Sequence, residues 1–391
     1  MRKFISIFLV ISLLLSFNLI ASASDDDMTD GSDTVTGAEE ICKSVKSAVL
    51  MDASTGTVIF EKDGSVSLPP ASVTKVMTLL LVAEALEKGS ITPEQEVTVS
   101  SYAASMGGSQ VFLSEGEEFT VEELLKCAII ASANDASVAL AELIGGTEQS
   151  FVSMMNDRAK QLGLTGSHFE NCTGLDDEVV KHELSALDIA KLSRELINYP
   201  IVMKYTRIWQ DSIRDGEFVL TNTNRLVRYY KGCTGLKTGS TDKAGFCVSA
   251  TAERDGMHLI AVVMGAETRE ARNECARALL DFGFSGFSLY SDPSCELEKV
   301  PITHGNLTEV AVLKEGFFCL VKRSDIPLIE KKYFIPDKID APFEKGDVIG
   351  RVEYYLENEK LGECGIVASA ECSRIGIWDI FVEMIMTIIT G

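Results

Sequence analysis

Residues 244–266 read AGFCVSATAERDGMHLIAVVMGA and contain the strongest hairpin signal in the chain. Two apolar runs of β-prone residues meet at Asp255-Gly256, a dipeptide that favours the tight turn of an antiparallel hairpin. Upstream, residues 47–62 read SAVLMDASTGTVIFEK and place two similar runs around Ser54-Thr55-Gly56. Together the two segments predict an antiparallel sheet.

Helical patterns accompany these hairpins. Residues 72–88 are apolar on almost every side and are followed by Gly89, which is typical of a central, buried helix. Three more segments have helical patterns with start or stop signals and begin at Thr120, Thr147 and Ser185, and a further helix is expected from Arg269 to Phe282. Helices combined with an antiparallel sheet predict an α+β fold.

The length suggests two domains, and the character of the sequence changes near residue 291. The 391 residues are 46% hydrophobic and 24% charged, as in ordinary globular proteins. Residues 42–290 contain the hairpins and helices described above. Residues 291–370 instead hold short β-branched segments separated by Gly, Pro or Asn. We therefore expect an α+β domain at 42–290 and a small all-β domain at 291–370.

The first 23 residues have the pattern of a signal peptide. Arg2 and Lys3 precede an apolar run from Phe4 to Ile20, and Ala21-Ser22-Ala23 provides a cleavage site. A transmembrane anchor is the alternative, but the run is short. We expect residues 1–23 to direct export, and residues 24–41, which are acidic without a basic residue, to form a flexible leader.

Residues 371–391 follow another pattern. From Ser373 to Gly391, apolar residues surround a narrow polar stripe at helical spacing. A membrane-spanning helix needs about 20 apolar residues, which is more than this segment offers. The helix either packs on its own β domain or lies in the outer face of the cell membrane, with Trp378 at headgroup level. We favour the amphipathic anchor, although only Arg374 is basic, which weakens attraction to anionic lipid.

Charge and cysteine usage limit the possible partners and the covalent framework. The net charge of -22, with no long Lys/Arg block, argues against a nucleic-acid partner. The ten cysteines are scattered, without a C-x-x-C pair, and several lie in apolar stretches where a thiol behaves as a small hydrophobe. We therefore predict mostly free, buried thiols instead of a disulfide framework.

The sequence lacks the motifs that several common catalytic mechanisms require. The four histidines form no H-E-x-x-H motif, and no Cys/His cluster has the spacing of a zinc site, so we expect no metal and no cofactor. The chain also lacks a G-x-S-x-G elbow, a Walker A loop and a G-x-G-x-x-G loop. A hydrolase built on this chain must activate its nucleophile without histidine or metal.

Lysine can perform that activation, and PPASVTK at residues 69–75 offers a serine–lysine pair. The spacing places Ser72 and Lys75 on one face of the helix that begins there. Burial lowers the pKa of a lysine, so that its neutral amine can take a proton from serine. Alone, an S-x-x-K match is weak, and Ser240 with Lys243 forms a second one.

Two further triplets strengthen the case. Ser132-Ala133-Asn134 interrupts an apolar helix in a polar turn, and Lys237-Thr238-Gly239 precedes the strand pair at Ala244, where a substrate-binding edge strand would lie. Either triplet alone fits an ordinary helix cap or turn. All three motifs in this order favour one shared active site.

With these motifs the chain resembles the serine D-alanyl-D-alanine carboxypeptidases, the low-molecular-mass penicillin-binding proteins of peptidase family S11. The resemblance extends over residues 42–290 through LPPASVTKVMT, SANDASVALAELIGGT and GLKTGSTDKAGFCVSATAERDGMHLIAVVMGA. It implies the DD-peptidase/β-lactamase-like fold, followed by the family's smaller β domain and membrane anchor. Ala133 stands where many relatives have glycine, and Ser240 where histidine or tyrosine is frequent; both departures bear on substrate preference.

The resemblance implies three catalytic residues. Ser72 would attack the carbonyl of the D-Ala-D-Ala bond and form an acyl-enzyme that water later hydrolyses. Lys75 would be the general base for this attack, and Ser132 would relay the proton to the leaving D-Ala. The backbone N–H groups of Ser72 and Ser240 would form the oxyanion hole.

The substrate-binding residues follow from the same resemblance. Asn134 would hold the substrate amide, while Lys237 and Thr238 would bind the terminal carboxylate, with Gly239 and Ser240 on the same strand. The implied partners are peptidoglycan stem peptides ending in D-Ala-D-Ala, and β-lactams, which would acylate Ser72.

Three other functions remain open. A D,D-endopeptidase of the same fold would cleave cross-links with the same residues. A class A β-lactamase shares S-x-x-K and K-T-G, but its E-x-x-L-N segment is missing here and it would not have the extra β domain. A non-catalytic peptidoglycan-binding module would have no need for a nucleophile paired with a base.

Overall fold

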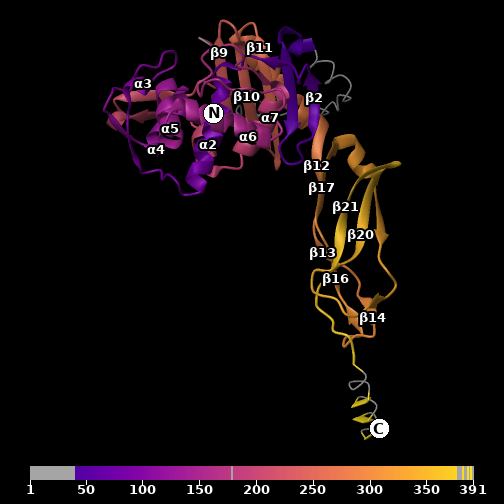
Figure 1. Cartoon of the computed structure of the whole chain (residues 1–391). Helices are drawn as coiled ribbons and strands as arrows, with labels where there is room; N and C mark the ends of the chain where they lie inside the picture. Colours follow the sequence, from indigo (N-terminus) through magenta and orange to yellow (C-terminus); the bar gives the residue numbers. More distant parts are fainter. Residues whose placement is uncertain (1–39, 178, 377–380, 383–384, 387, 390–391) are drawn as a thin grey trace, which may run out of the picture.

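A computed structural model describes residues 40–177, 179–376, 381–382, 385–386 and 388–389. It has an α+β domain followed by an elongated β-rich domain that extends away from the first (Figure 1). The predicted fold class is confirmed for these two parts. The expected signal peptide at 1–23 and nearly all of the expected leader at 24–41 lie outside the described residues.

The centre of the first domain is a five-stranded antiparallel sheet, with strand order β2-β1-β11-β10-β9. The strands are β1 (Ser47–Asp52), β2 (Val58–Lys62), β9 (Cys233–Thr241), β10 (Gly245–Arg254) and β11 (Met257–Ala266). Asp255 and Gly256 connect β10 to β11 with φ angles of 49° and 78°. Positive φ at both turn residues is what a tight hairpin requires, so the predicted hairpin is confirmed.

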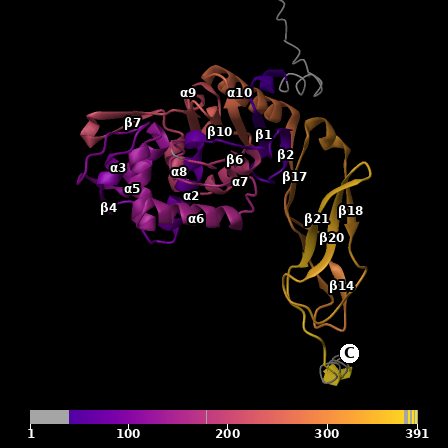
Figure 2. The same ribbon diagram turned by 45° about the horizontal axis from the view of Figure 1, so that its top comes forward.

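The sheet is covered on both faces, as Figure 2 shows, with α10 (Arg269–Gly286) on one side and α7 (Ala186–Leu196) on the other. Alternate residues of β11 therefore enter two different apolar cores. Ile260 and Val262 belong to the core on the α7 side. Leu259 and Ala261 belong to the core on the α10 side. Burial on both faces explains why β11 is apolar almost throughout.

The first domain also contains further helices and three short strand pairs. The helices are α2 (Lys75–Glu87), α3 (Ser101–Ala104), α4 (Val121–Lys126), α5 (Asn134–Gly145), α6 (Glu148–Gln161), α8 (Pro200–Thr206) and α9 (Leu226–Tyr229), with 3-10 turns η1 (Cys42–Ser44), η2 (Ala71–Thr74) and η4 (Arg214–Gly216), and the π-helical turn η3 (Cys127–Ala131). The two-stranded pairs are β3 (Ser67–Leu68) with β6 (Leu184–Ser185), β4 (Glu96–Thr98) with β5 (Glu118–Thr120), and β7 (Gln210–Ile213) with β8 (Phe218–Thr221).

The central helix was predicted from its lack of a polar face, and the structure confirms it. Residues 75–85 of α2 are all buried. The chain leaves the helix at Gly89 with a φ of 69°, a left-handed conformation that glycine adopts without strain. The capping prediction at Thr120 is also confirmed, because Thr120 and Glu123 bond reciprocally at the start of α4.

The second domain is built from strands around a small core of its own. A five-stranded sheet has the order β13-β16-β21-β20-β18, beside a three-stranded group β15-β14-β19 and the pair β12-β17. The elements are β12 (Phe287–Asp292), β13 (Cys295–Glu296), β14 (Val300–Thr303), β15 (Glu309–Val310), β16 (Val312–Lys314), β17 (Phe317–Lys322), η5 (Arg323–Leu328), β18 (Ile329–Phe334), β19 (Ile339–Asp340), β20 (Val348–Leu356) and β21 (Glu359–Ala368).

The expected C-terminal helix over 371–391 needs correction at its start. Cys372 and Arg374 form β-bridges with Phe343 and Gly305, so this part is extended against the β domain. Residues 381–382, 385–386 and 388–389 are helical, and the others beyond Gly376 lie outside the described residues. Among the described helices, none has the length and hydropathy to cross a membrane.

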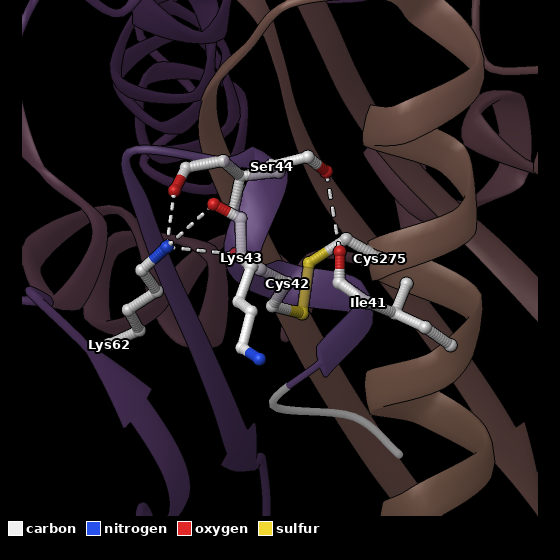
Figure 3. Close-up of a disulfide and its surroundings, with 7 residues drawn as sticks. Ile41, Cys42, Lys43, Ser44, Lys62 and Cys275 are labelled. Carbon is white, nitrogen blue, oxygen red and sulfur yellow. Dashed lines mark hydrogen bonds between the residues drawn. A yellow bond between two sulfur atoms is a disulfide. The ribbon is translucent and has the colours of Figure 1, made fainter. Parts of the chain in front are cut away.

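The cysteines depart from prediction at one pair. Cys42 and Cys275 form a disulfide that ties η1 to α10 (Figure 3). The other eight cysteines are free, and five of them are buried, as expected for small apolar side chains. The pair joins residues 233 positions apart, so no local pattern in the sequence could reveal it.

Reduction of this disulfide is expected to destabilise the chain. Closing a long loop removes conformational entropy from the unfolded state, and native disulfides typically contribute about 2–4 kcal/mol. We expect a reductant to lower Tm by roughly 5–10 °C in thermal unfolding monitored by circular dichroism. In a Cys42→Ser variant the reductant should have no further effect; an equal shift in both proteins would contradict the prediction.

Candidate active site

The serine–lysine pair lies at the start of the central helix. Ser72 is in η2, and Lys75 is the first residue of α2. The Nζ of Lys75 lies 2.9 Å from the Oγ of Ser72. Proline and a 3-10 turn precede the α-helix, yet the three-residue spacing still brings both side chains to one face, as predicted.

Lys75 is completely buried and has no carboxylate partner within hydrogen-bond distance among the described residues. Besides the Ser72 hydroxyl, its Nζ has two neutral acceptors in the described part of the chain: Asn134 Oδ1 at 2.6 Å and the Thr173 carbonyl at 2.8 Å. Burial lowers the pKa of Lys75 to about 7, because the ammonium loses its hydration. Roughly half of the lysine is then a neutral amine at neutral pH, able to accept a proton.

The second triplet lies in the turn that the sequence predicted. The π-helical turn η3 ends at Ala131, Ser132 follows with a φ of 62°, and α5 begins at Asn134. Ser132 and Asn134 are both buried. The break between the two helical segments therefore points both side chains at groups on other elements: Asn134 at Lys75, and Ser132 at Lys237.

The third triplet lies on β9, an edge strand of the central sheet. Lys237 is buried and donates to Ser132 Oγ at 2.6 Å. Burial, reinforced by the nearby Lys75 and Arg272, holds the pKa of Lys237 well below its usual range. Thr238 donates from its hydroxyl to Thr223 Oγ1 at 2.8 Å. The edge position leaves one side of β9 without a neighbouring strand, as a substrate-binding strand requires.

Gly239 allows β9 to approach the nucleophile closely. A Cβ built on Gly239 would lie 2.6 Å from the backbone nitrogen of Ser72 and 2.9 Å from the carbonyl oxygen of Pro70. Both contacts are to backbone atoms, which cannot rotate away. Any side chain here would therefore separate the strand from the serine, which explains the glycine of the K-T-G triplet.

These elements enclose one cleft of about 560 Å³. Ser72, Ser132, Thr238, Gly239 and Ser240 line it, while Lys75 and Lys237 lie behind the two serines. The structure thus brings all eight predicted residues together. Lys243, the lysine of the second S-x-x-K match, is instead exposed.

A loop from Gly107 to Leu113 forms another part of the wall and contributes Ser109 to the cleft. The backbone N–H of Asn134 donates to the Ser109 carbonyl at 2.7 Å, and its side-chain amide donates to the Gly107 carbonyl at 2.7 Å. The loop therefore holds the amide that contacts Lys75.

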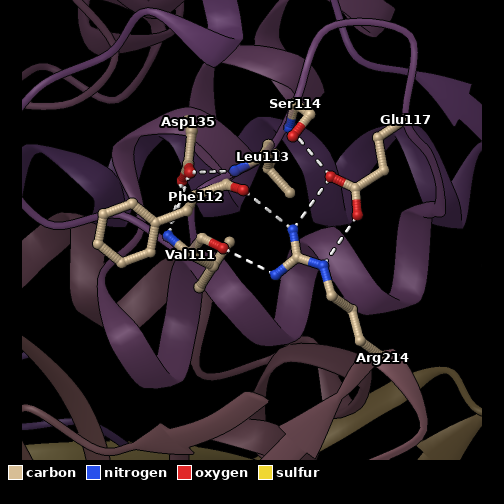
Figure 4. Close-up of polar contacts among 7 residues, drawn as sticks. All are labelled: Val111, Phe112, Leu113, Ser114, Glu117, Asp135 and Arg214. Carbon is tan, nitrogen blue, oxygen red and sulfur yellow. Dashed lines mark hydrogen bonds and ion pairs between the residues drawn. The ribbon is translucent and has the colours of Figure 1, made fainter. Parts of the chain in front are cut away.

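Figure 4 shows how the outer side of this loop is fixed. Arg214 donates to the carbonyls of Val111 and Phe112, at 2.9 and 3.0 Å, and forms a two-point ion pair with Glu117. Asp135 accepts the N–H groups of Val111 and Leu113, both at 3.1 Å. Neither Arg214 nor Asp135 was recognised in the sequence, since these partners, the backbone groups of the loop and the Glu117 carboxylate, lie more than 20 positions away along the chain.

Sequence reasoning also missed part of the cleft wall. The missed residues are Ser109, Trp209, Thr221, Asn222, Thr223, Arg225, Tyr229, Arg269 and Arg272. Most come from loops and helix ends without a recognisable motif. The sequence did offer one signal for this part of the cleft: TREAR at residues 268–272, directly after the hairpin, contains two arginines. Among the described residues, no group of His, Cys, Asp and Glu side chains could hold a metal ion.

Comparisons with known proteins agree over both domains. The family model described as D-alanyl-D-alanine carboxypeptidase, peptidase S11, matches residues 34–268. The model described as the C-terminal domain of penicillin-binding protein 5 matches residues 284–374. The chain is 40% identical over 383 residues to D-alanyl-D-alanine carboxypeptidase DacF of Bacillus subtilis, with 96% of each chain covered.

Solved structures show the same similarity. Penicillin-binding protein 5 from Haemophilus influenzae superposes with a TM-score of 0.73 at 28% identity, covering 85% of this chain and 98% of that one. Penicillin-binding protein D2 from Listeria monocytogenes, solved with ampicillin bound, has a TM-score of 0.57 at 30% identity and covers 62% of this chain and 98% of that one.

Proposed function

This chain belongs to peptidase family S11 and is a serine-type D-alanyl-D-alanine carboxypeptidase of the penicillin-binding proteins, and from this premise we propose how its cleft performs the reaction. The substrate is a peptidoglycan stem pentapeptide, and the product is the tetrapeptide with free D-Ala. The residues of the three motifs carry the chemistry.

Ser72 is the nucleophile and Lys75 its general base. The neutral amine of Lys75, 2.9 Å from the hydroxyl, takes the proton as Oγ bonds to the carbonyl carbon of the penultimate D-Ala. The backbone N–H groups of Ser72 and Ser240 stabilise the oxyanion, each contributing about 3–4 kcal/mol. The C–N bond then breaks, the leaving amine takes a proton through Ser132, and water hydrolyses the resulting ester.

Substrate binding uses the strand and the buried amide. Asn134 holds the peptide amide, and Lys237 with Thr238 binds the terminal carboxylate. The approaching carboxylate raises the pKa of Lys237 again, because an opposite charge favours the ammonium form. Buried, positively charged Arg272 on the same cleft strengthens this preference for a free C-terminus, which is what makes the enzyme an exopeptidase.

The observation that carries this mechanism is a fully buried lysine in hydrogen-bond distance of the cleft serine. The purified chain should release one D-Ala from diacetyl-L-Lys-D-Ala-D-Ala and form a covalent adduct with benzylpenicillin on the peptide that contains Ser72. Slow loss of the adduct, followed by intact mass, distinguishes it from an efficient β-lactamase. No release and no adduct would leave a binding module as the function.

We propose further that the chain is exported through residues 1–23 and rests on the outer face of the cytoplasmic membrane through Ser373–Gly391. Exposed apolar side chains in the described helical positions support this, including Ile388 and Ile389, which are 78% and 72% exposed. The full chain should float with anionic phospholipid vesicles, and a chain ending at Ser373 should not. Equal behaviour of the two would contradict the anchor.

A further inference from the structure

Three arginines line the cleft beside the carboxylate-binding strand. Arg225 directly precedes α9, while Arg269 and Arg272 lie in the first turn of α10. All three line the cleft that also contains Ser72 and Thr238. Arg272 is buried, with 3% of its surface exposed, whereas Arg225 and Arg269 reach solvent at the rim.

None of these arginines has an acidic partner within the described part of the chain. Arg272 donates only to neutral oxygens: Asn273 Oδ1 at 3.0 and 3.1 Å, and the Cys247 carbonyl at 3.4 Å. The side chains of Arg225 and Arg269 take part in no hydrogen bond or ion pair among the described residues. This is unexpected in a chain with 58 acidic and 36 basic residues, where carboxylates are plentiful.

The three charges are close enough to affect one another. Burial, followed by the charge of Arg269, lowers the pKa of Arg272 to about 10; Arg225 contributes to the same lowering, while Cys247 and Glu270 oppose it. The N-terminus of α10 adds the positive end of an 18-residue helix at the same place. Glu270, in the same helical turn, offsets part of this repulsion without forming an ion pair with Arg272. The like charges that remain raise the energy of the empty cleft, and a bound anion lowers it.

Two contacts connect the elements of these arginines to β9, the strand assigned above to the terminal carboxylate. Thr238 is bonded to Thr223, two residues before Arg225. Arg272 is bonded to the carbonyl of Cys247, which pairs with Gly239 across β9 and β10. All three arginines thus line the same cleft as Thr238, which is assigned above to the terminal carboxylate. Trp209 lines the same cleft, and its indole N–H is buried without an acceptor among the described residues.

We propose that Arg225 and Arg269 form a subsite for a second carboxylate on the leaving residue, an inference that rests on the proposed function. The α-carboxylate of a leaving D-Ala is already matched by Lys237, Thr238 and Arg272. The two remaining guanidinium groups fit a leaving residue with a further acidic group. Such a residue is either a terminal acidic D-amino acid or, in a cross-linked peptide, an acidic diamino acid that ends the neighbouring stem, so that its second carboxyl is free.

The chemistry is the same for both substrates. Ser72 Oγ bonds to the D-Ala carbonyl carbon, the C–N bond to the leaving residue breaks, and the freed amine takes the proton. Water then hydrolyses the acyl-enzyme. For a cross-linked peptide this reaction is a D,D-endopeptidase activity, which separates two stems instead of shortening one.

The test compares leaving residues that differ only in charge. We expect wild-type kcat/KM for diacetyl-L-Lys-D-Ala-D-Glu to exceed that for the D-Gln peptide about tenfold at low ionic strength. At 1 M salt the ratio should approach one, because the Debye length falls to about 3 Å. A general structural role of the arginines would not produce this salt dependence.

Two variants and a matched control complete the test. Arg225→Gln and Arg269→Gln should each lower kcat/KM for the D-Glu peptide three- to tenfold and for the D-Gln peptide by less than twofold. Arg277→Gln, at an exposed position of α10 outside the cleft, should change neither. Equal rates for both peptides in the wild type, or equal losses in the variants, would overturn the proposal.

A purified cross-linked dimer, whose leaving residue is an acidic diamino acid at the end of its stem, separates the two sources. Cleavage that declines in both variants assigns the subsite to cross-links. A preference confined to the linear D-Glu peptide assigns it to terminal acidic residues. A wild type that releases D-Ala from D-Ala-D-Ala but shows no charge preference would contradict the second-carboxylate subsite and leave the carboxypeptidase function intact. A wild type that releases no D-Ala would contradict the carboxypeptidase function itself.

Discussion

Ser72→Ala is expected to lower kcat/KM for D-Ala release on the order of 10⁵- to 10⁶-fold, as removal of an activated nucleophile does in other serine hydrolases. The hydroxyl is the only group that the proposed reaction bonds to the substrate, and alanine leaves Lys75 with no proton to take. The variant should also form no adduct with benzylpenicillin by intact mass.

The fold is not expected to respond to this change, because Ser72 is only half-buried and loses one oxygen atom. Unfolding temperatures of the variant and the wild type should agree within about 1 °C. Ser54→Ala, in the exposed turn between β1 and β2, is the matched control and should retain full activity. An adduct on Ser72→Ala would show that another residue is the nucleophile.

Lys75→Met is expected to slow acylation by benzylpenicillin on the order of 10³- to 10⁴-fold, since general-base catalysis contributes about 10²–10⁴-fold and the amine also orients Ser72. Lys75→Arg should be equally impaired, because a guanidinium cannot lose its proton in this pH range. Lys243→Met is the matched control: it alters the second S-x-x-K match, at an exposed lysine, and should leave the rate unchanged.

The same lysine predicts the pH dependence. Its neutral form is the base, and burial lowers its pKa to about 7. Protonation below this value removes the base, so the acylation rate should fall about tenfold per pH unit below pH 7 and level off above it. Stopped-flow acylation between pH 5 and 9 measures this profile. A midpoint near 10, the pKa of a solvated lysine, would show that Lys75 is not the base.

Local sequence patterns were sufficient to predict most of the helices and strands that are discussed above. Asp255-Gly256 predicted a hairpin because few other dipeptides adopt positive φ at both turn positions. Thr120 and Glu123 predicted a helix start because their bonds join neighbours in the chain. Residues 72–88 are apolar on almost every side, which predicted a buried helix. Each of these signals acts over a few residues, and the structure reproduces them.

Contacts between segments far apart in the chain could not be predicted from such local patterns. The Cys42–Cys275 disulfide depends on η1 meeting α10, and the start of the expected C-terminal helix was wrong because Cys372 and Arg374 pair with loops of the β domain. Arg214 and Asp135 hold a loop through its backbone groups, which any sequence presents. The unpaired arginines of the cleft become conspicuous only once their surroundings are known.

For the active site too, one part follows from local sequence patterns and another part only from tertiary contacts. The three motifs, their order and the antiparallel sheet follow from the sequence by itself, since spacing along a helix or strand determines which side chains share a face. Only the tertiary structure separates the two S-x-x-K matches. Packing buries Lys75 against Asn134 and Thr173, whereas Lys243 remains in solvent. A lysine becomes a base at neutral pH through loss of hydration, and that depends on what the rest of the chain packs around it.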